Sequence, residues 1–205
     1  MKICFTLDDV IRAKTMQIGK IYKKYIDKDI DLDSLDFSNF DDYWKIFGFK
    51  DEKEYINFLY QEYAFEIFAE ASVTDKMVDK NLNMWHLHAN DDKDINETIE
   101  LCLANPLEFN NSIGFTYFFL SRIATRIREV YLPTDSLSIW DKCDVLVTAN
   151  PKLLRNKPVN KIVIKIEMPY NENIESDFKY ESLKDFLSDK EIIKKIINKR
   201  ATDNE

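Results

Sequence analysis

The chain has 205 residues, of which 45% are hydrophobic and 13% aromatic, so it is long enough to bury a sizeable core. Its formal net charge of -8 argues against binding to a nucleic-acid backbone, which requires a basic surface. No apolar run reaches the length of a membrane-spanning helix, and no apolar signal segment opens the chain. We therefore expect a soluble cytoplasmic protein without a membrane partner.

Five short segments of the chain are β-branched or apolar on both faces, which is typical of interior strands. They are residues 2–7, 99–104, 127–132, 144–148 and 161–168. Helical patterns lie between them, including 111–125, before which Asn110, Asn111 and Ser112 are interpreted as caps, and 136–142. This alternation predicts an α/β fold, with a Rossmann-like parallel sheet flanked by helices.

The segment between the first two strands is longer than a simple crossover requires. Residues 20–84 are helical in character, and 51–71 carry apolar side chains at helical spacing after an acidic first turn. We expect an α-helical cap over 20–84, inserted after the first strand into a core formed by 1–19 and 85–170. Residues 171–205 are predicted to form a C-terminal helical tail after a polar loop.

The three cysteines, Cys4, Cys102 and Cys143, are far apart in the sequence, and each lies in or beside an apolar run. No C-x-x-C pair of the kind that binds metals is present. We interpret these residues as small buried hydrophobic side chains in a reducing compartment.

The first predicted strand ends in the sequence TLDDV, and the helical insert follows it directly. A strand that ends in a D-x-D-x-[VT] signature, followed by an inserted cap and a parallel sheet, resembles the haloacid dehalogenase-like (HAD) superfamily. The spacing is most similar to the 5′(3′)-deoxyribonucleotidase branch, over about residues 2–165 and four motif sites in order. In that family the first Asp is a nucleophile that forms an aspartyl-phosphate, and the second is an acid/base.

The resemblance implies that Asp8 takes the place of the acid/base and that Thr6 stands where the nucleophile belongs. A Thr hydroxyl without an adjacent base is a poor nucleophile, and it cannot bind Mg²⁺ as a carboxylate does. An alternative register makes Asp8 the nucleophile, but it places Val10 in the acid/base role and worsens the spacing. If the site is active, Asp8 and Asp9 are its candidate residues; the structural interpretation is that they cap the turn after the strand.

The three later motif sites also depart from the family pattern. The runs in question are LCLANPL, PTDS and VLVTANP. Ala104 and Asn105 occupy the turn where the family has Thr or Ser, and Ser136 stands where it has a charge-balancing Lys. Thr148 and Ala149 replace two acids that hold Mg²⁺. We therefore expect no catalytic residue, no metal and no cofactor at this relic site.

Three functions remain open from the sequence. The favoured one is a non-catalytic HAD-like protein that acts as a binding or structural module, with protein partners or through self-assembly. Degenerate members of this kind resemble phage-encoded proteins, which implies a virion or assembly component. The alternatives are a divergent Mg²⁺-dependent 5′-nucleotidase or phosphatase using Asp8, and binding of a nucleotide or phosphate without hydrolysis at the carboxyl ends of the strands.

Overall fold

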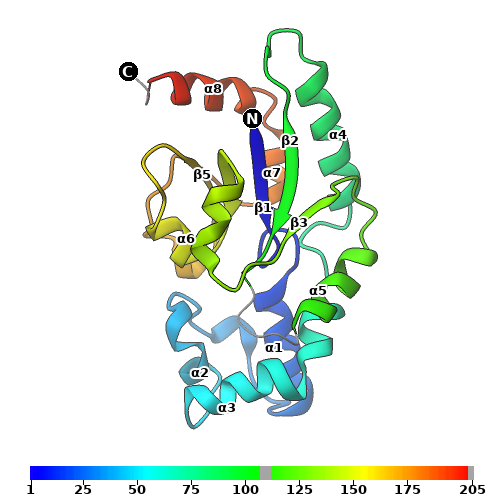
Figure 1. The fold of residues 1–205 in the computed structure, drawn as a ribbon. Coiled ribbons are helices and arrows are strands. Elements are labelled where there is room, and N and C mark those ends of the chain that lie inside the picture. Colours follow the sequence, from blue (N-terminus) through cyan, green and yellow to red (C-terminus); the bar gives the residue numbers. More distant parts are fainter. Residues whose placement is uncertain (107–111, 203–205) are drawn as a thin grey trace.

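The computed structural model describes residues 1–106 and 112–202 (Figure 1). Parallel pairing joins six strands into one sheet in the order β3-β2-β1-β4-β5-β6. The strands are β1 (Lys2–Thr6), β2 (Glu100–Ala104), β3 (Glu129–Tyr131), β4 (Val145–Thr148), β5 (Ile162–Ile166) and β6 (Phe178–Tyr180). The predicted α/β fold with a Rossmann-like parallel sheet is confirmed. Asn110 and Asn111 lie outside the described residues, so their capping role stays a prediction.

Helices cover both faces of the sheet, so the central strands are buried on both sides. One layer contains α4 (Val78–Asp91), α5 (Ser112–Ser121), α7 (Leu183–Ser188) and α8 (Ile192–Thr202). The other contains η5 (Ser136–Lys142) and α6 (Pro151–Arg155). Side chains alternate between the layers: Phe5 and Val147 pack into the first cluster, Cys4 and Leu146 into the second.

All five predicted strands are present, with ends that differ from the prediction by one or two residues. The sixth strand was not predicted, because residues 171–205 were expected to be a polar loop and helices. Instead β6 extends the sheet beside β5, with Phe178 opposite Ile164. Three residues of strand are too short for a recognisable period of two, so the sequence pattern did not reveal β6. The predicted tail helices correspond to α7 and α8.

The chain between β1 and α4 forms a separate helical cluster at the carboxyl end of the sheet, at the bottom of Figure 1. Its elements are α1 (Lys14–Tyr25), η1 (Leu32–Ser34), η2 (Phe40–Asp42), α2 (Tyr43–Ile46), α3 (Glu52–Asn57), η3 (Phe58–Glu62) and η4 (Phe65–Ala69). These elements bury an aromatic-rich core of their own, which includes Tyr22, Phe47, Phe58, Tyr60 and Phe68. We call this cluster the cap.

Residues 51–71, which carry apolar side chains at helical spacing, form three helical segments rather than one. The helix begins as expected, because the Asp51 side chain accepts a hydrogen bond from the Glu54 amide. After α3, however, the chain forms two wider π-helical segments, η3 and η4. In η4 the consecutive residues 67–69 are all buried, which one face of a regular α-helix does not allow. A pattern search at 3.6 residues per turn does not reveal this change.

The three cysteines lie together between β1, β2 and η5, in the second core cluster. All three are free and buried, as the sequence predicted. Cys4 is opposite Cys102 in the parallel pairing of β1 and β2. Hydrogen bonding with the thiols of Cys102 and Cys143, together with burial, raises the pKa of Cys4 well above its usual value.

No helix within residues 1–106 and 112–202 combines the length and the apolar character needed to cross a membrane.

Candidate functional site

A small pocket opens at the carboxyl ends of β1, β2 and β4, where open α/β sheets bind their ligands. Four residues that the sequence singled out line it together: Thr6, Asp8, Asp9 and Asn105. Four more were not predicted: Lys14, Pro106, Asn150 and Tyr170. The candidate site therefore gathers side chains from the ends of β1, β2, β4 and β5 and from the segments that follow them.

Thr6 is the last residue of β1 and is almost completely buried. Its hydroxyl donates to Thr148 Oγ1 at 3.1 Å, and the carbonyl of Val147 lies 3.5 Å away. In the part of the chain that the structure describes, no carboxylate or imidazole is hydrogen-bonded to this hydroxyl. A threonine in this setting has no base to activate it as a nucleophile.

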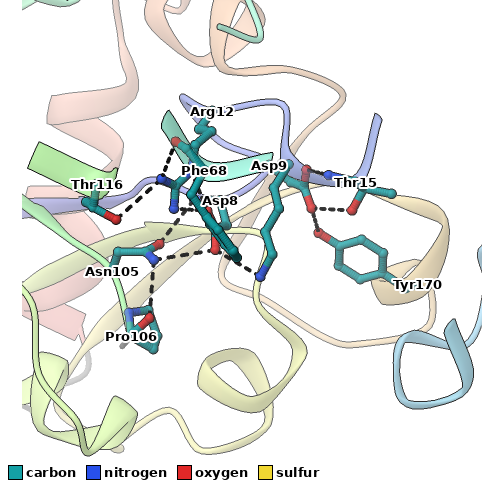
Figure 2. A network of polar contacts seen from close by, with 10 residues as sticks. Asp8, Asp9, Arg12, Thr15, Phe68, Asn105, Pro106, Thr116 and Tyr170 are labelled. Carbon is teal, nitrogen blue, oxygen red and sulfur yellow. Dashed lines mark hydrogen bonds and ion pairs between the residues drawn. The ribbon is translucent and has the colours of Figure 1, made fainter. Parts of the chain in front are cut away.

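Asp8 is held by two cations, Lys14 and Arg12, the second of which is labelled in Figure 2. Arg12 Nε and Nη2 both donate to Asp8 Oδ1, at 2.8 and 2.5 Å, and Lys14 Nζ lies 3.2 Å from Oδ2. Asn105 completes the set, since its Oδ1 accepts from the Asp8 amide at 3.2 Å. Burial alone would favour the neutral acid, but attraction by the two cations outweighs it and lowers the pKa of Asp8 to about 2.

Arg12 joins the core of the molecule to the cap. Its side chain is fully buried, and Nη1 donates to the carbonyl of Phe68 at 3.0 Å and lies 3.4 Å from Thr116 Oγ1 (Figure 2). The guanidinium also lies 5.2 and 5.3 Å from the ring centroids of Phe68 and Phe119. One buried cation thus contacts the turn after β1, the cap segment η4 and the helix α5.

Lys14 supplies a positive charge in the pocket that was not predicted from the sequence. The family's charge-balancing Lys has no equivalent at Ser136, and we inferred a site without such a cation. Lys14, the first residue of α1, instead enters the pocket from the other side and pairs with Asp8. The sequence does place a Lys six residues after Asp8. The spacing alone, however, does not show that the turn after β1 folds back and brings this Lys to the end of the strand.

Asp9 has a structural role in the turn. It adopts a left-handed backbone conformation with φ of 59°, which is uncommon for a residue other than glycine. Its Oδ1 accepts from the Thr15 amide at 2.8 Å, and Oδ2 accepts from the hydroxyls of Thr15 and Tyr170 at 2.6 and 2.8 Å. Burial raises the pKa of Asp9, although these hydrogen bonds partly offset it. The interpretation of this acid as a cap of the following turn is confirmed by its bonds to Thr15.

The remaining predicted positions are not part of the pocket lining. Ala104 pairs with Thr6 across the sheet, and Thr148 contacts Thr6 from β4. The Ala149 carbonyl accepts a hydrogen bond from Asn171. Ser136 is buried at the start of η5, away from the residues that line the pocket. The fold therefore brings Thr6, Asp8, Asp9 and Asn105 together and leaves Ser136 apart.

These residues do not fit Mg²⁺, which requires several free oxygen ligands. Both oxygens of Asp8 face cationic nitrogens, and both oxygens of Asp9 accept hydrogen bonds from Thr15 or Tyr170. In the described part of the chain, no group of three or more His, Cys, Asp or Glu side chains is arranged to hold a metal ion. We therefore derive no chemical step that involves a metal.

Solved structures share this architecture. CbbY from Rhodobacter sphaeroides, in a crystal structure with phosphate, superposes with a TM-score of 0.52 and 13% identity over 90% of this chain and 95% of that one. This chain therefore shares the fold of CbbY. A second structure, from Burkholderia xenovorans LB400 and assigned to the haloacid dehalogenase-like hydrolases, gives a TM-score of 0.46 at 11% identity, covering 94% of this chain and 97% of that one.

Sequence comparison alone did not detect this relationship: no protein-family model matches the sequence, and the comparison with curated proteins gave no match. The likeness to CbbY is therefore a likeness of fold, seen in the structure and not in the sequence.

The low pKa of Asp8 predicts that the folded protein is less stable in acid. A carboxyl whose pKa falls from 3.8 to about 2 on folding adds stability that is complete above about pH 4 and is lost as the pH falls towards 2. We expect this contribution to be about 2 kcal/mol at neutral pH. Urea unfolding of the wild type and of Asp8→Asn between pH 5 and 2 should show the stability difference between them shrink by that amount.

Asp9 provides the internal control for this measurement. Its pKa is raised, so its contribution has the opposite sign: it is present at low pH and lost as the pH rises through the folded pKa. Both proteins contain Asp9, so the part of this contribution that comes from burial cancels in the comparison, whereas the smaller part that comes from the Asp8 charge is lost in Asp8→Asn. A stability difference that stays constant from pH 5 to 2 would show that Asp8 is not ion-paired in the folded state.

Proposed function

We propose that this HAD-like protein is non-catalytic and that its relic phosphoryl-transfer site now joins the cap to the core. The observation that carries the proposal is the ion pairing of Asp8 with Arg12 and Lys14. A general acid works best with a pKa near the working pH. A carboxyl with a pKa of about 2 stays ionised, so Asp8 cannot protonate a leaving group efficiently.

The lack of a nucleophile at Thr6 and of acids at the fourth motif also supports a non-catalytic protein. Phosphoryl transfer depends on a positioned nucleophile and on charge neutralisation. The strand-end hydroxyl of Thr6 is hydrogen-bonded to Thr148, and the fourth-motif positions are Thr148 and Ala149 rather than acids. The divergent Mg²⁺-dependent nucleotidase or phosphatase that uses Asp8 is the alternative, as is membership of the deoxyribonucleotidase branch with activity retained.

A phosphatase assay tests this proposal. We expect no turnover of an aryl phosphate or of nucleoside monophosphates with Mg²⁺, and no change on adding a chelator. Thr6→Asp should also stay inactive, because Asp8 remains paired with its two cations. Turnover by the wild type that disappears in Asp8→Asn or in Asp9→Asn would refute the proposal, whereas turnover that persists in both variants indicates a contaminating phosphatase.

A second candidate function is binding of an oxyanion, such as a phosphate or nucleotide, without hydrolysis. Lys14, Asn105 and Asn150 all line the pocket at the carboxyl edge of the sheet, and their side chains carry N–H donors. Asn150 also accepts hydrogen bonds from the first amides of α6, so its position is fixed.

Calorimetry with inorganic phosphate and nucleoside monophosphates tests this second function. Saturable binding that is lost in Lys14→Met and kept in Lys20→Met would support it, since Lys20 is an exposed lysine on the same helix. Heats at the level of dilution for the whole panel would exclude it.

As a non-catalytic module, the protein would act through protein partners or self-assembly. A role as a phage virion or assembly component, and hence a virion rather than a cytoplasmic location, follows only from the resemblance of degenerate members to phage-encoded proteins. Co-purification with the products of neighbouring genes would test it: stable association with a structural protein would support the role, and recovery of the chain alone would count against it.

A further inference from the structure

A second cavity lies within the cap, next to the pocket at the strand ends. Its volume is about 310 Å³, at the lower end of the range for small-molecule sites. Residues of α1, η2, α2, α3 and η3 line it, and these elements lie together in the lower part of Figure 1. We call it the cap cavity.

Aromatic side chains form much of the wall of the cap cavity. Tyr43 and Tyr60 are almost completely buried, whereas Trp44 and Tyr55 are partly exposed. Each aromatic ring has a negative face, which attracts a positive charge. A wall of this kind accepts either an apolar ligand or an organic cation, and the charged groups beside it decide between the two.

Two carboxylates, Asp41 and Glu52, lie on the exposed part of the same lining. Neither forms an ion pair with another residue within 1–106 and 112–202; the neighbouring pair joins Lys45 to Asp42 instead. The opening of the cap cavity thus has two negative charges beside aromatic rings, and the formal net charge of -8 of the whole chain adds to the attraction for a cation.

Lys14 also lines the cap cavity, but its charge is balanced in the neighbouring pocket. Its Nζ lies 3.2 Å from Asp8 Oδ2. The two acids Asp8 and Asp9 and the two cations Arg12 and Lys14 together carry no formal charge. The two carboxylates at the opening therefore set the sign of the charge that the cap cavity prefers.

We propose that the cap cavity binds a small organic cation. Its ammonium group lies near Asp41 and Glu52, and its apolar body packs against the rings of Tyr43 and Tyr55. This role is separate from the strand-end pocket and does not depend on whether catalysis has been lost there.

An NMR titration with three probes of nearly equal size tests the proposal: benzylamine, which is positive at neutral pH, benzyl alcohol, which is neutral, and benzoate, which is negative. Trp44 lines the cap cavity, whereas Trp85 and Trp140 belong to α4 and η5. Its indole N–H resonance, assigned with Trp44→Phe, therefore locates the binding. We expect benzylamine to shift this resonance alone among the three indoles, benzyl alcohol to bind at least about tenfold more weakly, and benzoate to leave it in place.

The double variant Asp41→Asn, Glu52→Gln should weaken benzylamine binding at least about tenfold, because it removes both charges at nearly constant size. The matched control is Asp29→Asn, Glu70→Gln, which removes the same charge from exposed residues of the cap segment outside the lining and should bind like the wild type. Thermal unfolding checks the fold of each variant, since Glu52 also lies in the first turn of α3.

Four results would refute the proposal: no shift of the Trp44 resonance with benzylamine, equal binding of the three probes, tightest binding of benzoate, or equal weakening by the two double variants. The phosphatase assay uses other ligands and other variants, so the cation site and the loss of catalysis are tested separately.

Discussion

Replacing Arg12 by Met should destabilise the folded protein by about 3–5 kcal/mol, because removing one partner of a buried ion pair leaves the other charge uncompensated. Arg12 is fully buried, and the variant loses both bonds to Asp8 and the bond to the Phe68 carbonyl. Met keeps much of the apolar volume, so the loss reports mainly on the charge and its hydrogen bonds. Urea unfolding measures the change in the free energy of unfolding.

Two further variants show whether the effect comes from the pair. The pair of Arg200 with Glu97 has N–O distances of 2.9–3.0 Å, but about a third of each side chain is exposed, so Arg200→Met is a control that should cost at most about 1 kcal/mol. The double variant Asp8→Asn, Arg12→Met should lose less stability than the sum of its single variants. Additive losses would mean that Asp8 and Arg12 do not stabilise each other.

Replacing Lys165 by Met should cost about 2–4 kcal/mol, because three carbonyl oxygens lose their shared donor. Lys165 lies on β5 with only 3% of its side chain exposed. Its Nζ donates to the carbonyls of Asn171, Glu172 and Ile174 at 3.2, 3.0 and 2.9 Å. This ammonium therefore fixes the loop after β5, and amide exchange at Ile174 should become faster in the variant.

Lys179 is the control for this second prediction. It is the register partner of Lys165 on β6 and lies near the same carboxylate, Glu167, but 70% of its side chain is exposed. Lys179→Met should change stability by no more than about 0.5 kcal/mol. If both substitutions lowered stability equally, the burial of Lys165 and its bonds to three carbonyls would not be the cause of the loss.

The sequence predicted the sheet well because its interior strands are short and apolar on both faces, a pattern that few other elements produce. The prediction from sequence failed for elements whose structure is decided by tertiary packing rather than by the local pattern of apolar residues. The edge strand β6 has only three residues, and its partly exposed side chains carry no continuous apolar run. The π-helical segment η4 packs against α5 through Phe65, and no helical period in the sequence encodes such a contact.

Half of the pocket lining was predictable, because strands of a parallel sheet bring their carboxyl ends to one edge. Thr6, Asp8, Asp9 and Asn105 follow from that rule. Tyr170, by contrast, is 161 residues from its partner Asp9 and lies in a loop after β5. Arg12 sits in an apolar stretch close to Asp8, where the sequence does not show whether a cation is solvated or buried.

The reaction rate of the buried thiols with a labelling reagent reports how often the sheet of this protein opens. Cys4, Cys102 and Cys143 share one core cluster, and reagents that modify sulfur attack the thiolate, which burial and a raised pKa disfavour at Cys4. Their modification therefore has to wait until the central strands separate. Labelling followed by mass spectrometry should show all three sulfurs reacting together, at a rate set by that opening rather than by the movements of the cap.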